Sequence, residues 1–162
     1  MEKVTFGNVV GFVLALLFAL VIGVSMWALL LGDYVNTIMN EQTRHTLQIV
    51  GYAAGLAALV TWWVQQFAAN RGFLVRFLFA LFIFIVAFCS FGGALRIVYL
   101  MITYPNQLDW SLSGLYWSSL SDFYSFVLFM LVPPRPAYAG LMLAAAVYVA
   151  IFGPRGPKTI RA

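Results

Sequence analysis

An uncharged segment with the sequence FLFALFIFIVAFCSFGGAL runs from Phe77 to Leu95, between Arg76 and Arg96. Its 19 residues would form about 28 Å of helix, which is close to the thickness of the hydrocarbon core of a bilayer. The apolar run continues past Arg96 until Pro105 ends it. The segment therefore predicts a membrane-spanning helix at about 76–104, with Arg96 inside the membrane or at its edge.

Three further apolar segments predict membrane-spanning helices. The first lies at about 9–31 and the second at about 47–69, and each contains 23 uncharged residues. The second ends near Trp62 and Trp63, and paired tryptophans are typical of a membrane interface. The last, at about 137–153, is short, but neighbouring helices or local bilayer thinning can absorb the mismatch.

The composition of the whole chain supports a membrane protein. Of its 162 residues, 64% are hydrophobic and only 9% are charged, whereas about 25% of the residues of a soluble domain are charged. These values exclude a soluble globular domain, a disordered tail and a disulfide-rich secreted module. We predict one all-α domain over residues 1–162: an integral membrane bundle of four transmembrane helices. An interfacial or re-entrant helical segment is expected at 106–132, and a basic cytoplasmic tail at 154–162.

Two topologies fit these segments, and the basic residues distinguish them. With four spans, six of them face the cytoplasm: Lys3, Arg71, Arg76, Arg155, Lys158 and Arg161. Only Arg44 and Arg135 would then lie in outer segments. If 115–132 also crosses, giving five spans, the basic residues divide evenly between the two sides. Since positive charge near span ends favours the cytoplasmic side, we expect four spans, both termini in the cytoplasm, and a bacterial inner membrane as the location.

Small residues recur along the predicted spans at intervals that allow close helix contact. The candidate helix-packing or partner-facing residues are Gly7, Gly11, Ala15, Ala19 and Gly23 on the first span, Gly51 and Gly55 on the second, Gly92 and Gly93 on the third, and Gly140 on the fourth. One interpretation is packing within the bundle. The other is that one of these faces, on the first span, contacts a partner protein.

Few residues could carry chemistry. Arg96 is a candidate polar or lipid contact, because a charge at membrane depth is costly; the alternative is that it reaches the outer interface along its helix. His45 is expected to be solvated in a polar loop at 32–46, and Cys89 to be a buried thiol. One His and one Cys cannot form a bis-histidine haem site, a zinc site or an iron–sulfur cluster. We predict no catalytic, cofactor or metal site and no enzymatic activity of the chain alone.

These observations predict a non-catalytic integral subunit that scaffolds a larger membrane complex, such as a secretion, conjugation, respiratory or transport assembly. The expected partners are other integral membrane proteins and membrane lipid, with a homo-oligomer as a further option. Nucleic acid is not expected, because the basic residues form no stripe. The alternative function is a small oligomeric transporter or channel, with its pathway formed between copies and lined by Arg96 and Ser90. A third hypothesis is an accessory protein that binds a lipid or a quinone.

Overall fold

The computed structural model describes residues 6–34, 41–107, 111, 113–114, 117, 121 and 136–154. This part of the chain is mainly helical and contains no strand. The α-helices described there are α1 (Phe6–Tyr34), α2 (Glu41–Val64), α3 (Phe73–Thr103) and α5 (Pro136–Phe152). The 3₁₀ helices η1 (Gln65–Ala68) and η2 (Pro105–Gln107) follow α2 and α3. The predicted all-α fold is confirmed for the described residues.

Two of the helices are long and apolar enough to cross a membrane. They are α1, over Val10–Leu29, and the whole of α3. Helix α5 contains a shorter apolar stretch, Ala139–Phe152. Most of the predicted surface segment at 106–132, and the tail from residue 155 onward, lie outside the described residues.

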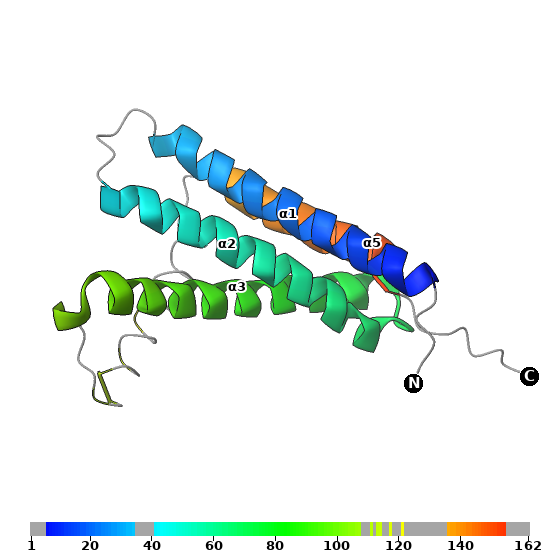
Figure 1. The fold of residues 1–162 in the computed structure, drawn as a ribbon. Coiled ribbons are helices and arrows are strands. Elements are labelled where there is room, and N and C mark those ends of the chain that lie inside the picture. Colours follow the sequence, from blue (N-terminus) through cyan, green and yellow to red (C-terminus); the bar gives the residue numbers. More distant parts are fainter. Residues whose placement is uncertain are drawn as a thin grey trace, which may run out of the picture.

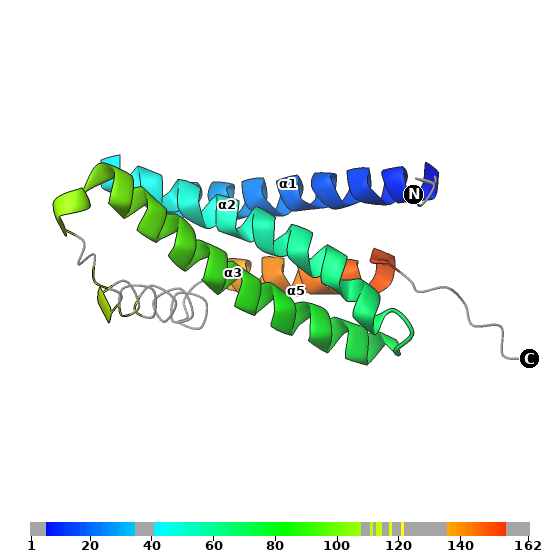
Figure 2. The same ribbon diagram turned by 60° about the horizontal axis from the view of Figure 1, so that its bottom comes forward.

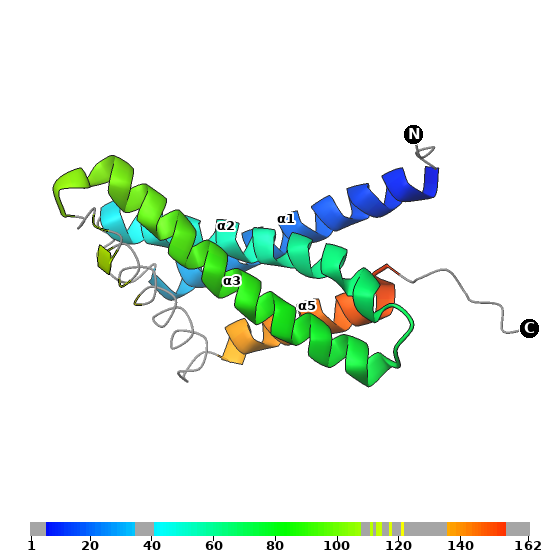
Figure 3. The ribbon, with the colours of Figure 1, turned by 90° about the horizontal axis from the view of Figure 1, so that it is seen from below.

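Among the described α-helices, each runs antiparallel to the one described before it (Figure 1). Helices α1 and α2 lie side by side, and α5 lies behind α1 in the view of Figure 1. Helix α3 packs against both α2 and α5 and crosses them obliquely (Figures 2 and 3). Consequently α1 begins and α5 ends at one end of the bundle, here called the terminal end (Figure 1). The opposite end, where α1 ends and α2 begins, is called the loop end.

The core depends on small side chains of α2. Four alanines are completely buried where α2 meets its neighbours: Ala53, Ala54, Ala57 and Ala58. Large buried side chains surround this row, among them Phe84 and Phe88 of α3 and Val149 of α5. Alanine lets the helix axes approach, so that dispersion contacts accumulate along their length.

An aromatic cluster connects three of the helices. Phe18 of α1 stacks on Tyr148 of α5 with ring centroids 4.8 Å apart, and Trp62 of α2 lies 5.9 Å from Phe18 and 6.0 Å from Tyr148. Trp62 is therefore a core residue, whereas Trp63 is 73% exposed. Successive residues of a helix point in different directions, so the two tryptophans cannot share one environment.

Candidate functional site

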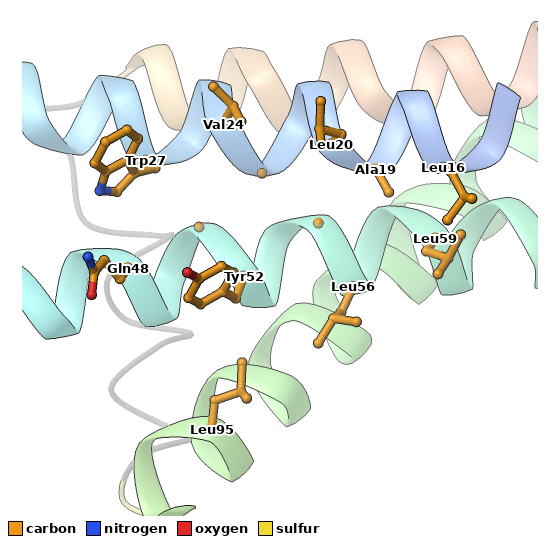
Figure 4. A pocket seen from close by; sticks show the side chains of 13 residues that line it. Leu16, Ala19, Leu20, Val24, Trp27, Gln48, Tyr52, Leu56, Leu59 and Leu95 are labelled. Carbon is orange, nitrogen blue, oxygen red and sulfur yellow. The ribbon is translucent and has the colours of Figure 1, made fainter. Parts of the chain in front are cut away.

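An open groove of about 670 Å³ runs along the contact between α1 and α2. Side chains of α1 form one wall and side chains of α2 the other, and Leu95 of α3 lies below α2 (Figure 4). Most of the lining side chains are aliphatic or aromatic, and none is charged. This volume lies in the range of about 300–1,000 Å³ that is common for small-molecule sites, and the mainly apolar lining is also typical of them.

Glycines lie where the two helices touch beside the groove. A Cβ atom added to Gly23 would lie 2.9 Å from the carbonyl oxygen of Gly51, and one added to Gly55 would lie 3.1 Å from that of Ala19. A Cβ on Gly51 would lie 3.0 Å from the Cβ of Trp27. Because these positions have no room for a side chain, α1 and α2 can approach this closely only with glycine there.

Polar side chains lie at one end of the groove only. Trp27, Gln48 and Tyr52 lie together toward the loop end, while Leu16 and Leu59 lie at the other end (Figure 4). Within the described part of the chain, none of the three polar side chains forms a hydrogen bond. Indole, amide and phenol groups all donate hydrogen bonds. This end of the groove therefore offers several donors without a charge.

A second group of polar residues, here called the Arg76 cluster, lies at the terminal end and consists of Gln65, Arg76, Gly153 and Pro154. Arg76 is only 6% exposed. Its Nη2 donates to the carbonyl oxygen of Gly153 at 3.1 Å and to that of Pro154 at 3.5 Å. Gln65, which is fully buried, donates through Nε2 to the carbonyl oxygen of Arg76 at 3.1 Å. The cluster ties η1 and the start of α3 to the end of α5.

Electrostatics favour this arrangement. The last carbonyl groups of a helix have no partner within it and carry a partial negative charge, so a cation beside them is stabilising. The guanidinium of Arg76 occupies this position at the end of α5. Gly153 leaves the space needed, because an added Cβ would meet the carbonyl oxygen of Val149 and lie 3.2 Å from Cγ of Gln65. The sequence pattern predicts only a cytoplasmic charge at Arg76 and gives no sign of the cluster.

The structure separates the small residues singled out in the sequence. Five of them lie in the contact of α1 with its neighbours or of α2 with α1: Ala15, Ala19, Gly23, Gly51 and Gly55. Gly92 and Gly93 are buried in α3. In contrast, a Cβ added to Gly11 or Gly140 would meet no atom within 4 Å. Gly7 lies in the first turn of α1, and its surroundings are outside the described residues.

The residues considered for chemistry lie apart from both sites. Arg96 is partly buried in α3, and the hydroxyl of Ser90 donates to the carbonyl oxygen of Val86 at 2.8 Å. Cys89 is fully buried, as predicted. His45 lies inside α2, and its ring centroid is 5.3 Å from that of Tyr99. The placement of His45 in a loop is wrong, because α2 begins earlier than its uncharged run; the side chain itself is partly exposed.

Metal ligation and similarity to known proteins give no further candidate. Among the described residues, no group of three His, Cys, Asp or Glu side chains is placed to hold a metal ion. No family model matches the sequence, and no curated protein or solved structure is significantly similar to it. The groove and the Arg76 cluster are thus the two candidate sites among the described residues.

Proposed function

We propose that this protein is a non-catalytic integral subunit of a larger membrane assembly and that it crosses the membrane four times. The observation that carries this proposal is that the buried polar side chains bond to the backbone of the chain itself. Thr61, Gln65 and Arg76 all donate to backbone carbonyl oxygens of the chain itself. Groups that bind or transform a substrate face a cavity instead. The buried polar groups therefore serve to position helices.

The hydrogen bond between Arg76 and Gly153 supports four crossings over five. It joins the start of α3 to the end of α5, which supports placing these two points at the same face of the membrane. If the chain crossed once more between α3 and α5, then α5 would run parallel to α3 and would end at the opposite face. The antiparallel order of α1, α2, α3 and α5 (Figure 1) supports an even number of crossings and, with it, both termini on one side.

The surface that we assign to a partner is the outer face of α1. In the most apolar stretch of α1 only 22% of the residues are buried, whereas 33% are buried in that of α3. The outer face consists of large apolar side chains, all at least 44% exposed: Val13, Leu14, Leu17 and Val21. A partner helix would pack against these side chains by dispersion contacts, because lipid removes the hydrophobic drive for helix association.

Assembly can be tested on membranes solubilised in a mild detergent. Blue-native electrophoresis should give a band well above that of the 18.0 kDa chain, and a harsh detergent should collapse it. A photo-crosslinking residue in place of Leu17 should capture a defined partner, whereas the same residue in place of Leu74, exposed on α3, serves as the matched comparison. Migration as a monomer in every mild detergent would contradict the proposal.

Topology can be tested separately by cysteine labelling in a Cys89→Ala background. Asn70 lies in the exposed turn between η1 and α3, and Ser113 is exposed beyond the other end of α3. A membrane-impermeant maleimide added to intact cells should label Ser113→Cys and spare Asn70→Cys, with the reverse in inverted vesicles. Ile160→Cys should behave as Asn70→Cys does. Labelling of Ile160→Cys from outside the cell while Asn70→Cys is spared would be incompatible with an even number of crossings.

A further inference from the structure

We propose that the α1–α2 groove binds one acyl chain of a membrane phospholipid, with the ester carbonyl groups of the lipid at the Trp27 end. The proposal requires the membrane placement argued above, but it does not depend on assembly with other subunits. Three features of the groove support it: its length, the chemistry of its two ends and the contacts that its small residues already make.

The length of the groove matches one leaflet of a bilayer. Its lining runs from Trp27 to Leu16 on α1 and from Gln48 to Leu59 on α2, which is about 16 Å along each helix. Half of a hydrocarbon core is about 15 Å. The groove therefore has the length of an acyl chain that starts at the membrane surface and ends near the middle of the bilayer.

The polar end of the groove lies at the depth of the lipid esters. Trp27 and Gln48 each lie about 10 Å from the loop end of their helices, at about 1.5 Å per residue. The 29 residues of α1 form about 43 Å of helix, so about 6 Å extends beyond the hydrocarbon core on each side. Trp27 and Gln48 thus lie just inside the core, and Tyr52 follows one turn deeper on α2, where its side chain can lean back toward the start of the helix. A polar group without a partner is costly at this depth. Ester carbonyl groups accept hydrogen bonds and carry no charge, which matches three uncharged donors.

The small residues of the groove favour a lipid chain over a partner helix. A helix is about 10 Å wide with its side chains and approaches closely only across small residues. Here Gly23, Gly51 and Gly55 already contact the opposite helix of the same chain. What remains accessible is a channel between larger side chains, such as Leu20 on α1 and Leu56 on α2 (Figure 4). A single methylene chain is narrow enough to enter it.

Photolabelling in liposomes tests this proposal directly. The protein is reconstituted with a phosphatidylcholine that carries a diazirine at the end of one acyl chain, and the labelled residues are mapped by mass spectrometry. Labelling should concentrate at Leu16, Leu20 and Leu59 and be weak at Leu17 and Val21, which are also exposed on α1. Equal labelling of these two sets would contradict binding of the acyl chain in the groove, but it would not contradict membrane insertion. Absence of all labelling would overturn both.

Matched variants test the same site without a photoreaction. Leu20 lines the groove and is 64% exposed, whereas Leu17 is 54% exposed and lies outside it. In native mass spectrometry from a mild detergent, Leu20→Trp should lose the retained phospholipid, and Leu17→Trp should keep it at one per chain. Tyr52→Phe should weaken retention about fivefold, as expected for the loss of one hydrogen bond. Equal retention by Leu20→Trp and Leu17→Trp would reject the site. If Leu20→Trp fails to fold, Tyr52→Phe decides, because Tyr52 is largely exposed.

Discussion

Replacing Gly23 by leucine should separate α1 from α2 and lower the free energy of unfolding by about 1–3 kcal/mol, as overpacking of a tight contact does. The atom nearest to the added Cβ is the carbonyl oxygen of Gly51, at 2.9 Å. A backbone atom cannot rotate away as a flexible side chain can, so the whole helix must shift. Unfolding in mixed micelles with increasing SDS, followed by circular dichroism, measures the change. The contacts that α1 makes with α2 should weaken first.

The chain provides its own controls for this experiment. Gly11 on the same helix and Gly140 on α5 have open space where a Cβ would be added. Gly11→Leu and Gly140→Leu should lower the unfolding free energy by no more than about 0.5 kcal/mol, as substitutions away from packed contacts do. If Gly11→Leu were as damaging as Gly23→Leu, the effect would reflect the added bulk of leucine at any glycine and not the close contact, since leucine has the higher helix propensity.

Replacing Arg76 by leucine should destabilise the bundle by about 1.5–3 kcal/mol, the value of hydrogen bonds to a charged group. Leucine fills much of the space but cannot donate to the carbonyl oxygens of Gly153 and Pro154, which would then lack their charged donor. The end of α5 should fray. The same SDS titration measures stability, and protease cleavage near the end of α5 in inverted vesicles should become faster.

Two further variants separate the cluster from a general effect of charge. Arg71 lies in the exposed turn before α3, so Arg71→Leu removes the same charge without breaking the cluster and should leave stability nearly unchanged. Arg76→Lys keeps a cation but loses the planar array of donors and should fall between wild type and Arg76→Leu. An Arg76→Leu protein as stable as the Arg71→Leu protein would show that the cluster contributes little.

The helices could be predicted from the sequence because the signal for them is local. Long uncharged runs bounded by charge, proline or glycine lie within α1 and α3 of the structure, since a membrane helix satisfies all of its backbone hydrogen bonds internally. Hydropathy predicts the second span only from about residue 47, although α2 begins at Glu41. Its first turns contain charged and polar residues, and hydropathy does not register a helix that continues beyond its apolar part.

The two sites could be predicted only in part, because each depends on contacts between distant segments. The spacing of Gly51 and Gly55 indicated a close contact on α2, but not that Gly23 would face them while Gly11 faced open space. That difference comes from the crossing of two helices. Likewise, the sequence predicts only a cytoplasmic charge at Arg76. The fold brings Gly153 beside it, and these residues are 77 positions apart in the sequence.

This separation between Arg76 and Gly153 has a consequence for biosynthesis. The ribosome releases α3 well before α5, so the guanidinium enters the bilayer region before the carbonyl groups that receive it have been made. A nascent chain that stops short of Gly153 would lack those acceptors, so the start of α3 would not be tied to the end of α5. Completion of the last helix is therefore the step that secures the third one, and C-terminal truncation should damage the protein far more than the number of deleted residues suggests.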